Sequence, residues 1–378
     1  MSNTSRPRSL VGPALVLVLL SVGACRKDAP IVEEPTEPTL VLPAQLYSYT
    51  LPPMPAHFSQ VLLQIWESTP DNNPITDAGA TLGRVLFYDH NLSANRTISC
   101  GSCHHQDKGF ADPVAASIGH NGGGTRRNAS HLVNQSYSRR QFWDQRAPNL
   151  EAQVLMPIQD AVEMGMTLPE VRTRLEGIEH YAPLFTEAFG NDSITDERVS
   201  RALAQFVRSI ASYRTRYDAG EANGFADFTQ PELDGKALFY NGVTKCNQCH
   251  MTANFHNQEP RNNGLDVEYT DNGRGEFTGN SEDNGKFKVP SLRNTELSAP
   301  YMHDGRFNTL EEVVEHYNGG IQAHPNLDDR LTVEGMIGGT PLQMGLTPYE
   351  KQALVAFLKT LTDVPLVTDV RFSDPFVR

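Results

Sequence analysis

Apolar residues recur at helical spacing in several segments of the chain, and capping residues mark where those segments begin. Three segments open with a threonine that can cap a helix, at Thr195, Thr309 and Thr347. In the second and third, a glutamate stands three residues after the threonine, which is the capping-box pattern. The apolar stripes that follow are Val199, Leu203, Phe206, Val207 and Ile210; Leu310, Val313, Val314 and Tyr317; and Leu354, Phe357, Leu358 and Leu361. No segment alternates strongly as a strand would, so the pattern predicts a mainly α protein with few strands.

A short segment of the chain occurs twice. Residues 83–88 read GRVLFY and residues 235–240 read GKALFY. Both copies lie in predicted helices, whose apolar faces are approximated by Leu82, Val85 and Leu86 in the first and by Leu233, Ala237 and Leu238 in the second. The repeat indicates that the two halves of the chain share one local architecture.

Each copy of the repeat is followed by a Cys-x-x-Cys-His run. The first run is Cys100, Cys103 and His104, and the second is Cys246, Cys249 and His250. Two thiols at this spacing can bond the two vinyl groups of one porphyrin, and the next histidine then lies under the iron. A disulfide or a zinc site is the alternative, but zinc needs four clustered ligands and these pairs lie far apart in the sequence. The motifs therefore predict two covalent haem c groups in two tandem cytochrome c-like domains.

The fifth cysteine belongs to a predicted targeting segment. Arg6 and Arg8 precede an apolar run, and small residues lead to Cys25. This order is typical of a secretory signal, and the apolar run is too short for a spanning helix. The cysteine after small residues is similar to a bacterial lipoprotein box, although Val22 stands where leucine is usual; an ordinary signal peptide is the alternative. We expect a periplasmic protein anchored by lipid at Cys25, and Arg26 favours the outer membrane.

The mature chain divides into a tether and two predicted domains. Residues 1–24 form the signal peptide, and residues 25–55, rich in Pro, Glu and Thr, form the lipid-anchored linker. Residues 56–222 and 223–378 are the two haem domains. Within the second, residues 256–286 are rich in Asn, Gly and Asp, which predicts a long loop.

Net charge limits the range of partners. The formal charge is −13, which argues against a nucleic-acid partner and is compatible with a basic electron-donor protein.

From Cys100 onward the sequence resembles the bacterial dihaem cytochrome c peroxidase and MauG family, and the resemblance covers residues 78–362. It is carried by the following segments in order: GH at 119–120, RNA at 127–129, QFWD at 141–144, Gln153, PIQ at 157–159, VEM at 162–164, VPSLRN at 289–294 and APYMHDG at 299–305. The resemblance implies an enzyme that cleaves hydrogen peroxide at the first haem and receives electrons at the second.

The resemblance implies roles for four residues around the first haem. Glu163 matches the family's proton-transferring base, and Gln153 matches its hydrogen-bonding glutamine. His120 matches the histidine that occupies the sixth position of the first iron in the resting peroxidases, beside a glycine-rich loop that can swing. Trp143 matches the tryptophan between the two haems.

Three residues are candidates for the sixth ligand of the second haem. Tyr317 stands at the position that the peroxidases fill with Met and MauG fills with Tyr. Met344, in the loop before the last helix, is where a small cytochrome c places its ligand, and Met302 is a third candidate. His120 therefore resembles the peroxidases while Tyr317 resembles MauG.

The family also implies one calcium ion and several partners. The matching calcium positions are the side chain of Asn128 and the backbone carbonyls of Ser298 and Pro300. The expected function is peroxide reduction with electrons from a small cytochrome c or cupredoxin, and a homodimer is compatible with the family. Two alternatives remain: a MauG-like enzyme that oxidises residues of a protein substrate, and a dihaem electron carrier without catalysis.

Overall fold

The computed structural model describes Met1 and residues 38–378, of which Thr39–Val377 form one compact unit. The predicted signal peptide, Cys25 and the first part of the linker lie outside the described residues. The α-helices are α1 (Val61–Trp66), α2 (Asp77–Tyr88), α3 (Leu150–Gln153), α4 (Met156–Gln159), α5 (Leu168–Glu176), α6 (Tyr181–Phe189), α7 (Asp196–Ser209), α8 (Arg216–Asn223), α9 (Gln230–Phe239), α10 (Cys246–Cys249), α11 (Arg274–Thr278), α12 (Leu310–Glu315), α13 (Pro348–Lys359) and α14 (Val364–Val367). In the described part of the chain, none of these helices has the length and apolarity to cross a membrane.

The prediction of a mainly α fold with few strands is confirmed. The sheet consists of β1 (Thr39–Leu40) and β2 (Phe376–Val377), paired antiparallel with Thr39 opposite Val377. Thr195 caps α7 by accepting a hydrogen bond from a backbone N–H of its first turn, and capping boxes open α12 and α13 as predicted. The segment predicted as a long loop is mostly irregular but contains the short helix α11.

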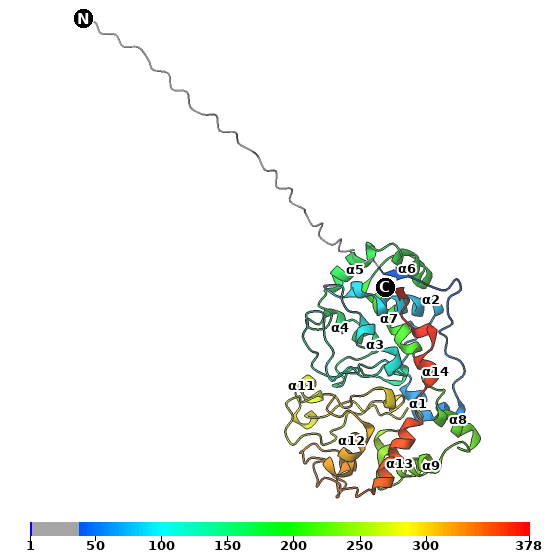
Figure 1. The fold of residues 1–378 in the computed structure, drawn as a ribbon, viewed down its shortest axis with the longest axis vertical. Coiled ribbons are helices and arrows are strands. Elements are labelled where there is room, and N and C mark those ends of the chain that lie inside the picture. Colours follow the sequence, from blue (N-terminus) through cyan, green and yellow to red (C-terminus); the bar gives the residue numbers. More distant parts are fainter. Residues whose placement is uncertain (2–37) are drawn as a thin grey trace, which may run out of the picture. The chain divides into compact units, whose positions relative to one another are not determined.

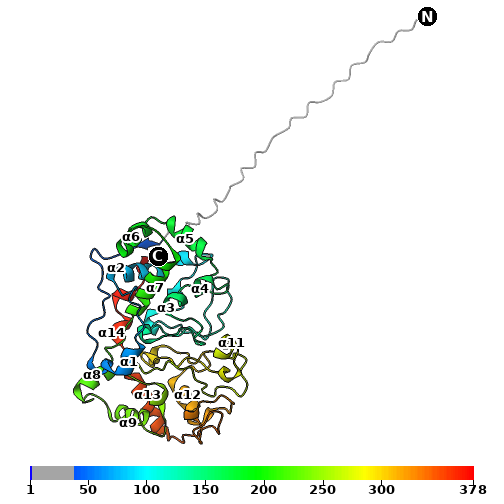
Figure 2. The same ribbon diagram turned by 180° about the vertical axis from the view of Figure 1, so that it is seen from behind.

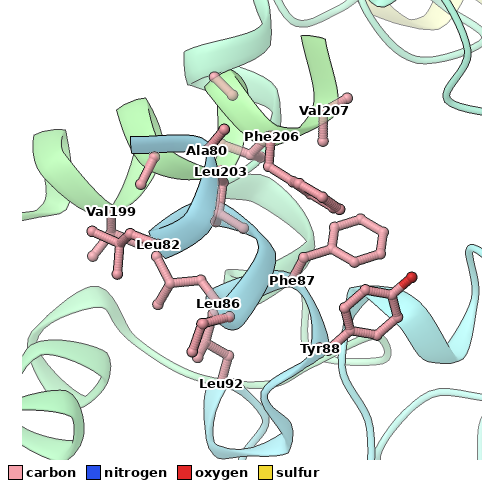
Figure 3. Packing of buried hydrophobic residues seen from close by; sticks show 14 of the residues in the cluster. Ala80, Leu82, Leu86, Phe87, Tyr88, Leu92, Val199, Leu203, Phe206 and Val207 are labelled. Atoms are coloured by element: carbon pink, nitrogen blue, oxygen red, sulfur yellow. The ribbon is translucent and has the colours of Figure 1, made fainter. Parts of the chain in front are cut away.

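The first hydrophobic core forms where α2 crosses α7 (Figure 3). Leu82, Val85 and Leu86 are fully buried, as the apolar face of the predicted helix required. At the crossing, a Cβ on Gly83 would lie 2.0 Å from the carbonyl oxygen of Ala202. Glycine at this position therefore lets the two helix backbones approach closely.

The second core repeats this arrangement with α9 and α13, which lie side by side in both views (Figures 1 and 2). A Cβ on Gly235 would lie 1.9 Å from the carbonyl oxygen of Ala353, so the repeated glycine has the same role in both halves. The predicted apolar face of this helix is wrong for Leu233, which is 37% exposed, and for Ala237, which is also exposed. Leu238, the third predicted residue, packs against this core. The close crossing at Gly235 turns Phe239 inward instead, where it packs against Phe357.

The C-terminal segment returns to the first core. Leu366 and Phe372 belong to the cluster around α2 and α7. The hydroxyl of Tyr88 donates to the carbonyl of Phe372 at 2.6 Å. The side-chain amide of Gln106, which follows the first haem motif, donates to the carbonyls of Leu366 and Asp369 at 3.2 and 2.8 Å. Residues near the end of the chain thus complete the core of the first half.

A third, smaller cluster joins the N-terminal segment to both halves. Phe58, Leu63 and Trp66 pack with Tyr137 and Ala253. The ring of Trp66 also stands edge-on to His256, with centroids 4.9 Å apart. Trp66 therefore has a packing role.

A buried ion cluster lies next to this third cluster. Arg293 is fully buried and forms two hydrogen bonds with Asp218, at 2.7 and 2.9 Å. His57 Nε2 lies 2.7 Å from the same carboxylate. The three residues come from segments that are distant in the sequence. The hydrogen bonds of His57 and Arg293 to the Asp218 carboxylate therefore link these segments.

Candidate active site

The two Cys-x-x-Cys-His runs have closely similar surroundings. Nδ1 of His104 lies 2.8 Å from the carbonyl oxygen of Phe110, and Nδ1 of His250 lies 3.1 Å from that of Phe255. Both phenylalanines have positive φ angles, +64° and +51°, which turn their carbonyls toward the histidines. A proton on Nδ1 that is donated to a carbonyl leaves Nε2 as a lone-pair donor, as an iron ligand requires.

The cysteines of both runs are free for covalent attachment. None of Cys100, Cys103, Cys246 and Cys249 forms a disulfide. Burial also lowers the pKa of His250 to about 4, which keeps this imidazole neutral and able to bind a metal. The residues therefore fit a haem c group at each run, attached through the two thiols and ligated by the histidine.

A cavity of about 210 Å³ lies beside the second run. Its walls are mostly apolar and include Cys246, Cys249 and His250. We call this space the second-haem cavity. All three candidates for the sixth ligand, Tyr317, Met302 and Met344, line it.

Tyr317 lies in a π-helical turn, His316–Gly320, that continues α12. Such turns reposition side chains and often occur at functional sites. The amide of Asn263 lies 3.4 Å from the hydroxyl of Tyr317 and 3.5 Å from the sulfur of Met302. Tyr317 and Met302, two of the candidate ligands, therefore both contact Asn263 in the cavity wall.

Glu163 lies close to the first haem motif. Burial raises the pKa of the thiols of Cys100 and Cys103 to about 12 and about 11, and the charge of Glu163 adds to both shifts. Burial, together with the neighbouring Asp160, raises the pKa of Glu163 itself from 4.5 to about 6, while Arg146 opposes the shift. This carboxylate is therefore half-buried within electrostatic reach of the first attachment site.

His120 contacts the segment that carries Glu163. Its backbone N–H donates to the carbonyl of Glu163 at 2.8 Å, and its Nε2 lies 3.1 Å from the carbonyl of Ala161. The preceding Gly119 is required by this contact, because a Cβ there would lie 1.8 Å from the carbonyl of Val162. The structure thus brings two of the predicted first-haem residues, His120 and Glu163, into one contact region.

Gln153 and Trp143 complete the predicted set. Gln153 ends α3, and α4 follows it directly; backbone hydrogen bonds from Met164 and Met166 to α4 then hold the turn that bears Glu163. The indole N–H of Trp143 donates to the carbonyl of Asn128 at 2.9 Å, and its ring lines the second-haem cavity.

Sequence comparison agrees with this geometry. Residues 77–224 match the pattern of the di-haem cytochrome c peroxidase family. The chain is 34% identical to a methylamine utilization protein MauG of Methylorubrum extorquens, over 78% of this chain and 81% of the relative. It is also 34% identical to a cytochrome c551 peroxidase of Nitrosomonas europaea, again over 78% and 81%.

Solved structures show the same fold. A MauG-like protein associated with microbial copper homeostasis superposes with a TM-score of 0.74 at 32% identity, covering 87% of this chain and 99% of that one. The diheme peroxidase BthA from Burkholderia thailandensis gives 0.68 at 23% identity, covering 80% and 91%. The chain belongs to the di-haem cytochrome c peroxidase family. It is therefore an enzyme of the cytochrome-c peroxidase class with two c-type haems.

The three residues predicted to bind calcium all belong to the wall of one cavity. Asn128, Ser298 and Pro300 all line the second-haem cavity. The side-chain amide nitrogen of Asn128 donates to the carbonyl of Val114 at 3.0 Å, so its side-chain oxygen faces away from that bond. Carbonyl and amide oxygens are donors that suit calcium.

Two basic residues near Trp143, the partly buried Lys288 and the buried His131, were missed from the sequence. Lys288 donates its backbone N–H to the carbonyl of Trp143 at 2.7 Å, and burial lowers the pKa of its ammonium group to about 8. His131 is buried beside it, with Nε2 2.9 Å from the carbonyl of Ser291. Lys288 directly precedes the segment at 289–294, and that position is the signal that could have drawn attention to it.

Proposed function

We propose that this protein reduces hydrogen peroxide to water at the haem attached to Cys100 and Cys103. Electrons from a small periplasmic cytochrome c or cupredoxin enter at the haem attached to Cys246 and Cys249. The observation that carries the proposal is Glu163, a half-buried carboxylate beside the first attachment site with a pKa of about 6.

Peroxide cleavage requires a proton to move from the near oxygen to the leaving oxygen. A haem attached at Cys100 and Cys103 would supply the redox-active iron that this reduction needs. Glu163 is mostly ionised at neutral pH, so its carboxylate can accept the first proton. Once protonated it is an acid with a pKa near the surrounding pH, which suits it to return that proton to the leaving oxygen. Gln153 is assigned to hydrogen-bond the bound peroxide.

The remaining residues are assigned supporting roles. His120 would bind the first iron in the resting protein, and movement of the loop at residues 121–124 would release it. Trp143 mediates electron transfer between the haems, which is supported by its place in the wall of the second-haem cavity. Asn128, Ser298 and Pro300 hold a calcium ion. Cys25 carries the lipid that anchors the protein to the outer membrane, and a homodimer is compatible with these assignments.

Tyr317 supports a second candidate function. A tyrosine facing the second-haem cavity is the MauG-like feature of this chain, and an anionic oxygen ligand lowers a haem potential relative to a thioether. In that case the enzyme would use peroxide to oxidise residues of a protein substrate. Tyr317→Phe should then change the charge-transfer and Soret bands of the second haem, whereas Met344→Leu should leave them unchanged. The opposite pattern assigns Met344 as the ligand.

The deciding experiment is peroxide turnover by the holoprotein with a reduced small cytochrome c. A peroxidase oxidises two cytochromes for each peroxide consumed. A MauG-like enzyme consumes peroxide with little cytochrome oxidation. A carrier consumes no peroxide and takes up at most one electron per haem from the reduced cytochrome. The proposal fails if the two-to-one stoichiometry is not observed with any basic cytochrome or cupredoxin donor tested.

A further inference from the structure

Two tyrosines of the second half are joined by a hydrogen bond. The hydroxyl oxygens of Tyr217, in α8, and Tyr240, at the end of α9, lie 3.1 Å apart. Tyr217 is 5% exposed, whereas Tyr240 is 42% exposed. The pair therefore runs from the interior of the second core to the surface.

The direction of the hydrogen bonds follows from the number of protons available. The hydroxyl of Tyr217 donates to a carboxylate oxygen of Glu221 at 2.5 Å. Its only proton is used in that bond, so Tyr240 must be the donor in the bond between the two tyrosines. Burial, together with these neighbours, raises the pKa of Tyr217, and its phenol stays protonated at rest.

Tyr217 is connected to the proximal side of the second haem site by direct contacts. Its ring stands edge-to-face on Phe255, with centroids 5.0 Å apart. The carbonyl of Phe255 is the hydrogen-bond acceptor of His250 Nδ1. Phe239, which lines the second-haem cavity, packs against the same Phe255 ring at 5.8 Å. One aromatic layer thus separates Tyr217 from the ligand histidine and from the cavity.

The equivalent position in the first half is built differently. Tyr88 occupies in the GRVLFY segment the place that Tyr240 occupies in GKALFY. Tyr88 is 8% exposed, and its hydroxyl donates to the backbone carbonyl of Phe372. A second buried tyrosine of that half, Tyr181, does donate to a carboxylate, that of Asp89, but it is fully buried. Tyr240, by contrast, reaches solvent, and through Tyr217 it is linked to a carboxylate.

We propose that Tyr217 and Tyr240 form a redox relay that carries oxidising equivalents from the second haem site to the protein surface. The proposal rests on the proposed function, because peroxide supplies the oxidant. In the first step Tyr217 loses one electron toward the second haem site and its phenolic proton to Glu221. In the second step Tyr240 passes its hydroxyl hydrogen, one proton with one electron, to the oxygen of Tyr217 along their hydrogen bond. The radical then resides on Tyr240 until a one-electron reductant in solution, such as a reduced small redox protein, restores it with a proton from water.

The carboxylate is what makes the first step feasible. An oxidised phenol is a strong acid, so its oxidation at neutral pH requires a base already in hydrogen-bond contact. Glu221 supplies that base at 2.5 Å, and its exposure lets the proton pass on to solvent. Glu221 is a positioning and proton-accepting residue of the relay rather than a residue of the peroxide site.

The test is rapid-freeze electron paramagnetic resonance of the holoprotein mixed with hydrogen peroxide in the absence of donor. We expect a tyrosyl signal that narrows when the protein is grown with ring-deuterated tyrosine. The signal should be lost in Tyr217→Phe and change its hyperfine pattern in Tyr240→Phe. Glu221→Gln keeps the hydrogen bond but cannot take the proton, so it should also lose the signal. Tyr181→Phe, which removes the carboxylate-bonded tyrosine of the other half, is the matched control and should retain it.

Each variant is checked by haem content and by the spectrum of the second haem. Tyr→Phe retains the ring that packs in the second core, and the exposed Glu221 can then be solvated, so folding should be preserved. A nitroso spin trap followed by peptide mass spectrometry should label Tyr240 in the wild type, and labelling should cease in Tyr217→Phe.

Failure of the relay and failure of the proposed function give different results. Peroxide consumption with reduced cytochrome but without a tyrosyl signal overturns the relay alone. A signal that persists in Tyr217→Phe, that is unchanged in Tyr240→Phe, or that disappears in Tyr181→Phe also overturns it. No peroxide consumption by the wild type overturns the proposed function and the relay that rests on it.

Discussion

Replacing Glu163 with glutamine should lower peroxide turnover and raise stability at the same time. Burial, with a smaller contribution from the neighbouring Asp160, raises the pKa of this carboxylate from 4.5 to about 6. At neutral pH the folded protein therefore carries a charge that its surroundings disfavour. Glutamine has nearly the same shape and retains a hydrogen-bonding group, but it has neither the charge nor the exchangeable acidic proton.

The two effects can be estimated separately. A general acid–base group contributes about 10²–10⁴-fold in rate, which corresponds to about 3–5 kcal/mol of transition-state stabilisation. The raised pKa costs stability only where the carboxylate is ionised in the folded protein. This cost is absent below pH 4.5, grows as the pH rises through about 6, and reaches about 2 kcal/mol at pH 7–8, at about 1.4 kcal/mol for each pKa unit. Glu163→Gln should therefore be more stable than the wild type at pH 7.5 and equally stable at pH 4.

The assays are peroxide turnover with reduced cytochrome and chemical denaturation at both pH values. Turnover of the wild type should fall as the pH drops below 6, and the residual turnover of Glu163→Gln should lack that titration. Glu187→Gln, an exposed change on α6, is the matched control and should alter neither quantity. Full activity of Glu163→Gln would show that another group moves the proton. Loss of haem or of stability would show that Glu163 is structural, and either result would refute the reasoning.

Three further predictions concern attachment, anchoring and the buried ion cluster. Denatured protein should retain two haems per chain after extraction with acid acetone, measured by the pyridine haemochrome spectrum; extractable haem would contradict the thioether bonds. Cys25→Ser should move the protein from the membrane fraction to the soluble periplasmic fraction, and a wild type already soluble would contradict the lipid anchor. Asp218→Asn should lower the free energy of unfolding by about 3–5 kcal/mol, because Arg293 would remain buried without its charge partner. Denaturant unfolding measures this loss, and the exposed Asp192→Asn should show none.

Local sequence signals predicted the helix starts and the two haem motifs, because their physical causes lie within a few residues. The threonine caps of α7, α12 and α13 depend on a side chain three residues from its backbone partner. The face of α9 could not be predicted in this way. Hydrophobic spacing favoured Leu233, whereas the buried face is decided by the contact of Gly235 with a backbone more than 100 residues away.

The surroundings of the candidate site were also beyond local patterns. The resemblance supplied Glu163 and Trp143, but the carbonyls that orient the two haem histidines depend on the positive φ angles of Phe110 and Phe255. Neither residue is of a type that predicts such a backbone conformation. The burial that raises the pKa of Glu163 comes from tertiary packing, and no spacing in the sequence contains that information.

The return of the C-terminal segment to the first core separates the order of synthesis from the order of folding. Leu366 and Phe372 follow the whole second half in the sequence, yet they fill the core around α2, and the carbonyl of Leu366 accepts a hydrogen bond from Gln106. A chain that emerges N-terminus first therefore cannot close this core when its first half is complete. The two halves are therefore not independent in folding, because the first core lacks part of its packing until the residues after α13 have been synthesised.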